Sequence, residues 1–166
     1  MAIAHSSRED KMPEKKTMQR ARKDAKEGKS TSTQAGEFVR EEMHHIRRGK
    51  HGARSSKQAI AIGLSKARRA GVKLSPPKKG TTSAATRKKA ARDTAKGQSH
   101  SKSKPSAKRS RATRSALKRE GRSAASHRSL SKQAKQAARK RRGTAASHRR
   151  TTAHHRTGRK TASHRK

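Results

Sequence analysis

The stretch SSKQAIAIGLSKARRAG, residues 55–71, decides the fold because it contains AIAIGL, the longest run in the chain without a polar residue. The serines at its start are typical N-caps, and Gly71 is a typical residue just beyond a helix end. Three basic residues precede that glycine, where positive charge suits the helix dipole. The stretch therefore predicts a helix over about 56–70.

The apolar residues of this helix lie on more than one side. Ile60, Leu64 and Ala67 share a face at about 100° per residue, whereas Ile62 lies on the far side. A helix with several apolar sides is usually buried between neighbours. We therefore expect AIAIGL to be the centre of a miniature core, with Ile62 covered by another helix or by a second copy in a homodimer.

Two further helices are predicted upstream, over about 11–27 and about 34–48. Asp10 is a candidate cap for the first, and Gly28 and Gly49 are candidate ends. The second helix has an apolar stripe that can cover the first face of AIAIGL. The expected head core comprises Phe38, Val39, Met43, Ile46, Ile60, Ile62 and Leu64.

Composition divides the 166-residue chain into two parts. Residues 1–74 carry 19 Lys and Arg against 8 Asp and Glu, whereas residues 75–166 carry 30 against 2. Only two large apolar residues lie beyond position 74, and they are Leu117 and Leu130. Low hydrophobicity with high net charge does not offset the entropy of ordering a chain. We therefore expect a mostly disordered protein: a small all-α head of two to three short helices over 1–74, and a disordered, basic, low-complexity tail over 75–166.

The stretch KSTSTQAGEFVREEMHHIRRGKHGARSSKQAIAIGLSKARRAGVKL, residues 29–74, resembles the core of an uncharacterised family of small basic bacterial proteins. MPEKKTMQRARKDAKEGK, residues 12–29, is similar to the lead-in of that family, so the resemblance covers about 12–74. It implies no activity, cofactor or site. The tail resembles linker-histone-like basic tails in composition only.

The tail's formal charge of +28 predicts binding to a polyanion, of which nucleic acid is the most abundant. Basic residues spaced by Ala, Ser, Gly and Thr, without aromatics, favour sequence-independent phosphate contacts over base stacking. We expect DNA rather than RNA, and a cytoplasmic, nucleoid-associated protein of bacterial source. The candidate nucleic-acid-binding residues are Lys88, Lys89, Arg92, Lys108, Arg109, Arg111, Arg114, Lys118, Arg119, Arg128, Arg139, Lys140, Arg141, Arg142, Arg149, Arg150, Arg159 and Lys160.

Other functions remain as alternatives: an adaptor whose head binds a partner protein, or an RNA- or ribosome-associated basic protein, since phosphate contacts do not separate the nucleic acids. The loop GKHGAR, residues 49–54, is glycine-flanked and basic, so it is either a phosphate contact or a plain connection. No catalytic motif is present, and we expect no enzyme activity, no small-molecule substrate and no membrane contact. The chain has no cysteine. His44, His45 and His51 are interpreted as exposed polar residues, so we expect no cofactor and no metal.

Overall fold

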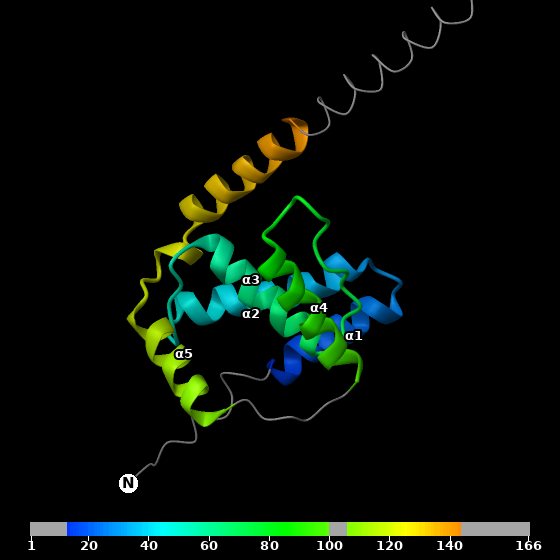
Figure 1. Ribbon diagram of the computed structural model, residues 1–166, viewed down its shortest axis with the longest axis horizontal. Coiled ribbons are helices and arrows are strands. Elements are labelled where there is room, and N and C mark those ends of the chain that lie inside the picture. The colour runs from blue at the N-terminus through cyan, green and yellow to red at the C-terminus, as the bar shows by residue number, and fades with distance from the viewer. Residues whose placement is uncertain (1–12, 100–105, 144–166) are drawn as a thin grey trace, which may run out of the picture. The chain divides into compact units, whose positions relative to one another are not determined.

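The protein is described by a computed structural model over residues 13–99 and 106–143, and it divides into two compact units, 1–126 and 127–166. The second unit is helical over 127–143. The elements of the first unit are α1 (Lys15–Lys26), α2 (Thr31–Arg47), α3 (Ser56–Arg69), α4 (Ala84–Gln98), α5 (Ala107–Arg119) and the 3-10 turn η1 (Ser123–Ala125) (Figure 1).

The three upstream helices are present, with ends set by the expected glycines. Gly28, Gly49 and Gly71 each follow a helix with a positive φ, a conformation that glycine adopts without a steric penalty. Ser55 caps α3 by accepting a hydrogen bond from the amide of Gln58. α2 begins earlier than the expected residue 34, because Ser30 caps it. Asp10, the candidate cap of the first helix, lies outside the described residues.

The expectation of two to three helices and a disordered chain beyond residue 74 is wrong for the described residues. α4, α5 and η1 extend the helical head, and 127–143 is a further helix. Ser83 caps α4 through a hydrogen bond from the amide of Thr86, and alanine makes up five of the fifteen residues of that helix. Alanine has the highest helix propensity and loses no side-chain entropy on folding. The count of large apolar residues therefore underestimated the order of this segment.

α2 and α3 pack through small side chains, which differs from the expected arrangement. Ala59 and Ala67 on α3 are fully buried and Gly63 between them is buried, whereas Ile60, Ile62 and Leu64 are only half-buried. A Cβ added to Gly63 would lie 2.7 Å from the Cα of Val39 on α2. The backbones approach so closely that the large side chains of AIAIGL lie beside the contact and not within it.

The apolar core centres on α2. Phe38 and Ile46 are fully buried, Met43 is 7% exposed, and Val39 is half-buried against α3. A cluster of Ala21, Ala35, Phe38 and Ala67 joins α1, α2 and α3, with half-buried side chains packed around it: Met18, Leu64, Ala70, Val72 and Leu74. Leu64 thus contacts the core from its edge.

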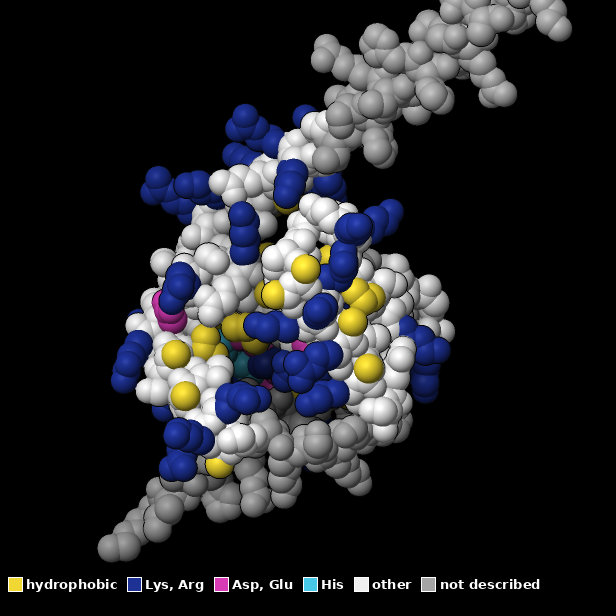
Figure 2. Space-filling view, viewed as in Figure 1, with side chains coloured by type: hydrophobic (Ala, Val, Ile, Leu, Met, Phe, Trp, Pro, Cys, Tyr) yellow, Lys and Arg dark blue, Asp and Glu magenta, His cyan; other side chains and the backbone are white. Residues whose placement is uncertain are grey.

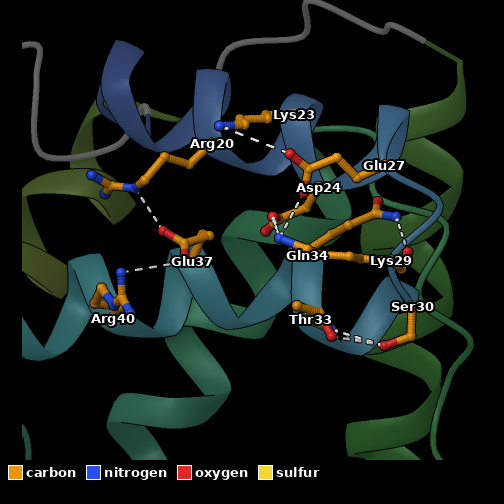
Figure 3. A network of polar contacts seen from close by, with 10 residues as sticks. All are labelled: Arg20, Lys23, Asp24, Glu27, Lys29, Ser30, Thr33, Gln34, Glu37 and Arg40. Carbon is orange, nitrogen blue, oxygen red and sulfur yellow. Dashed lines mark hydrogen bonds and ion pairs between the residues drawn. The ribbon is translucent and has the colours of Figure 1, made fainter.

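Polar residues join α1 to α2 on their exposed side (Figure 3). The guanidinium of Arg20 on α1 lies 2.6 Å from the carboxylate of Glu37 on α2. In the turn between the helices, Lys29 pairs with Asp24 and with Glu27, both at 2.8 Å. These two partners raise the pKa of Lys29 above its ordinary value. The contacts link α1, the turn and α2 along this side of the head.

A charged cluster lies inside the head, beneath the loop that follows α2. Glu42 has no exposed side-chain surface, and its carboxylate lies 2.7 Å from Nζ of Lys66 and 3.1 Å from Nε2 of His51. Burial alone would raise the pKa of Glu42, but these two partners hold it below the usual range. The contact with Glu42 raises the pKa of His51. The expectation that His45 and His51 are exposed is wrong, because both side chains are at most 10% exposed, and only His44 of this group is exposed.

α4 is held on α3 by one carboxylate and one glycine. Asp93 accepts a hydrogen bond from the hydroxyl of Ser65 and pairs with Arg69 at 2.9 Å. Gly97 is buried, and a Cβ at that position would collide with the carbonyl of Arg68. The acid and the glycine dock α4 where large apolar residues are absent.

α5 and η1 return to the loop between α2 and α3. The amides of Gly52 and Ala53 donate to the carbonyls of Leu117 and Gly121, at 2.8 and 3.1 Å. In η1, the carbonyl of Ala125 accepts a hydrogen bond from Arg47 on α2 at 2.9 Å. The carbonyl of Ala124 accepts one from the hydroxyl of Ser56 on α3 at 2.8 Å. Backbone hydrogen bonds thus attach this segment, so few large apolar side chains are needed.

The close α2–α3 approach predicts opposite effects for one substitution at two glycines. Gly36 on α2 has nothing within 4 Å of an added Cβ, so Gly36→Ala should raise the free energy of unfolding by about 0.5–1 kcal/mol through helix propensity. Gly63→Ala should lower it by about 1 kcal/mol or more, because the methyl group meets the backbone of Val39. Urea unfolding of both full-length variants, followed by circular dichroism at 222 nm, measures the difference. Equal stabilisation by both substitutions would contradict the packing.

Candidate nucleic-acid interface

The acidic residues that the structure describes are paired with basic residues within the fold. The described residues include eight Asp and Glu, and each one lies in an ion pair with Lys, Arg or His. The same residues include 38 Lys and Arg. On the face shown in Figure 2, Lys and Arg side chains are widely spread and Asp and Glu are sparse. Most of the positive charge is therefore not neutralised by the protein itself.

The cations of α4 lie on one side of the helix. At about 100° per residue, its exposed Lys and Arg fall within an arc of about 100°, and these residues are Lys88, Lys89, Arg92 and Lys96. Ala90 and Gly97, which are buried against the head, lie on the opposite side. Docking on α3 thus leaves a cationic face directed outward.

α5 contains six Lys and Arg and no acidic residue. Ser110, Arg114 and Leu117 are half-buried and share one side. The exposed cations on the remaining surface are Lys108, Arg109, Arg111, Lys118 and Arg119, and none of them makes an ion pair with a described residue. α5 therefore also presents an outward cationic face.

The helix over 127–143 has the most regular arrangement of charge. Five exposed cations follow one another at spacings of three or four residues, and they are Arg128, Lys132, Lys135, Arg139 and Arg142. This spacing places them within an arc of about 80°, along about 21 Å of helix. Leu130 and Ala137, both half-buried, lie on the opposite side. We call these five residues the basic stripe.

The described candidates for nucleic-acid binding lie on three separate helices, namely α4, α5 and the helix over 127–143. Arg114 on α5 is half-buried, and the other described candidates on α4, on α5 and over 127–143 are exposed. Arg149, Arg150, Arg159 and Lys160 lie outside the described residues. Lys132 and Lys135 were missed, although their spacing from Arg128 and Arg139 is visible in the sequence. The composition of SLSKQAKQAARKRR, residues 129–142, favours a helix formed on DNA, and a spacing of three or four residues on a helix places these cations on one face.

The GKHGAR loop does not present free backbone amides to a phosphate at its centre. The amides of Gly52 and Ala53 are already bonded to the α5 segment, and both residues are buried. A Cβ at position 52 would collide with the carbonyl of Glu120, so the glycine allows the close approach of the two segments. The loop is therefore a structural connection at these two residues.

Residues 30–79 match the model of a family of unknown function, DUF6496. The match covers α2, α3 and the segment that leads toward α4, in agreement with the resemblance of the head to an uncharacterised family. No curated protein and no solved structure matched the chain. None of the described helices is long and apolar enough to span a membrane.

The ion pairing predicts that outward cations and internal acids differ in their effect on stability. Replacing four outward cations of α5 by Gln, at Lys108, Arg111, Lys118 and Arg119, should change the free energy of unfolding by about 0.5 kcal/mol or less, because they have no acidic partner among the described residues. Asp93→Asn should lower it by about 1–2 kcal/mol, because Arg69 loses its anionic partner and one of the two accepting oxygens becomes an NH₂ donor. Thermal unfolding at fixed salt compares the two variants. A larger loss for the α5 variant would show that its cations act within the fold.

Proposed function

We propose that the protein binds duplex nucleic acid, most naturally DNA, without sequence preference, and that it is associated with the nucleoid. The observation that carries the proposal is the basic stripe on 127–143, supported by the cationic faces of α4 and α5. Exposed Lys and Arg that make no ion pair with a described residue can bind an external polyanion. Their binding releases condensed counterions, which is the main source of sequence-independent affinity for DNA.

The dimensions of the basic stripe suit a duplex. A helix about 10–12 Å in diameter fits the major groove of B-DNA, which is about 12 Å wide. Five cations along about 21 Å offer a contact at every turn of the helix. Lys and Arg in such a row contact phosphates and set position, and they carry no base readout by themselves.

The single aromatic residue favours a duplex over a single strand. Phe38 is the only Phe, Tyr or Trp of the chain, and it is fully buried in the core. Recognition of single-stranded nucleic acid commonly uses exposed aromatic side chains on which bases stack. With Phe38 enclosed, phosphate contact is the mode of binding that the side chains support.

The packed unit 1–126 has a distinct role in this proposal. It holds α4 against α3 and attaches the end of α5 to the loop between α2 and α3, while the exposed cations of both helices stay outward. We propose that this body docks or dimerises on the nucleic acid, while the surplus charge supplies the affinity. The adaptor function and the homodimer through Ile62 stay predictions, since no contact of the described residues favours a particular partner.

The test is the salt dependence of DNA binding by full-length protein. Replacing all five residues of the basic stripe by Gln should reduce the slope of log K against log salt by about 4, since each phosphate contact contributes about 0.9. Fluorescence anisotropy with a duplex of mixed sequence, between 50 and 300 mM salt, gives both slopes.

The matched control removes the same charge elsewhere. Five exposed cations with no ion pair to a described residue can be replaced by Gln, namely Lys15, Lys16, Arg22, Lys26 and Lys57. This control variant should retain most of the slope of log K against log salt that the unmodified protein shows. Equal slopes for the two variants would exclude a special role for the basic stripe. Duplex RNA of the same sequence, measured alongside, separates a DNA-binding function from the RNA alternative.

A further inference from the structure

The buried charged cluster brings a carboxylate, an imidazole and an ammonium group together inside the head. Glu42 presents one carboxylate oxygen to His51 and the other to Lys66, at 3.1 and 2.7 Å. Neither oxygen has a hydrogen bond of good geometry, although the side chain has no exposed surface. A buried carboxylate without such bonds costs free energy, and it usually marks an ion, a water or a functional role.

The ring of His51 is oriented as a ligand would be. Its Nδ1–H donates to the carbonyl of Gly52 at 3.1 Å, so the other ring nitrogen, Nε2, faces Glu42. In the neutral ring this Nε2 carries the lone pair. Proteins commonly orient a metal-binding histidine by such a bond from its second nitrogen to a carbonyl or carboxylate.

A second histidine completes the group. His45 is 5% exposed, and its Nε2 lies 3.0 Å from a carboxylate oxygen of Glu14 and 3.9 Å from one of Glu41. One ligand atom from each of Glu42, His45 and His51 lies within 4.8 Å of the others. Among the described residues, these three side chains converge from α2 and from the loop that follows it.

We propose that Glu42, His45 and His51 form a binding site for one divalent transition-metal ion of the Zn²⁺ class. Two imidazoles and one carboxylate are a ligand set typical of zinc, with metal–ligand bonds of about 2.0–2.2 Å. Tetrahedral bonds of that length place ligand atoms about 3.4 Å apart, so small side-chain rotations close the site. The ion binds the Glu42 oxygen that faces His51, and Lys66 remains paired with the other carboxylate oxygen.

The local charge favours a cation despite Lys66. Three carboxylates surround the two rings, from Glu14, Glu41 and Glu42, against two ammonium groups, from Lys50 and Lys66. With neutral imidazoles the formal charge of the cluster is therefore −1. The ion would also tie the loop at His51 to α2, and the next two residues of that loop hold the α5 segment. Metal binding at this position would therefore stabilise the attachment of α5.

Isothermal titration of chelator-treated full-length protein with Zn²⁺ tests the site. H45Q and H51Q should each weaken the tightest binding step by at least about tenfold. H44Q removes an exposed imidazole from the neighbouring position on α2 and should leave this step unchanged. Circular dichroism establishes that each variant retains its helices.

A measurement on the unmodified chain keeps the proposal testable where a variant does not fold. In ¹H–¹³C spectra, the ring signals of His45 and His51 should shift with the first equivalent of Zn²⁺, while that of His44 should not. A tight step that survives H51Q in folded protein, or a first equivalent that shifts other histidines instead, would overturn the site. In that case, Glu42 and its partners are a structural ion cluster only.

Discussion

The close approach of α3 to α2 at Gly63 is the contact on which the rest of the structure depends. Because no Cβ separates it from Val39, the two backbones meet and the alanines at positions 59 and 67 become buried. Small residues bury little area each, but close backbone contact gains many dispersion contacts. This geometry also places Lys66 beside Glu42, so the apolar contact and the buried ion pair are parts of one interface.

The few acidic residues beyond residue 74 form ion pairs that join this part of the chain to the first part. Residues 75–166 contain only Asp93 and Glu120, and each pairs with an arginine of the first part, at 2.9 Å for Arg69 and 3.4 Å for Arg54. Both pairs are partly exposed, so their individual energies are modest. Each pair joins a segment of low hydrophobicity to one place on the first part of the chain, while the neighbouring cations stay exposed. The acidic residues of these helices thus hold the fold together, while their exposed Lys and Arg are left for the proposed nucleic-acid contacts.

The proposed metal site and the proposed nucleic-acid surface are separable. The basic stripe would act through long-range attraction that salt screens, whereas the cluster around Glu42 is enclosed and would bind an ion at bonding distance. Loss of zinc binding would leave the phosphate contacts of 127–143 in place. Loss of the stripe would leave the head intact, since its five cations lie outside the unit that contains α1 to η1.

The sequence by itself determined the positions of α1, α2 and α3 to within a few residues, because caps, glycines and periodicity are local signals. It also determined the excess of positive charge and which cations are candidates for phosphate contact. It did not reveal the order beyond residue 74, because that order depends on alanine-rich helices held by backbone hydrogen bonds and single acids.

Only the tertiary structure decided which face of α3 is buried and that His45 and His51 meet Glu42 in the interior. Glu42 and His45 are three residues apart on α2, but His51 comes from the following loop and Lys66 from α3, and no spacing along the chain encodes the distances to these two. It also decided that Gly52, Gly63 and Gly97 are points of contact, because the need for a missing Cβ appears only when another backbone lies there.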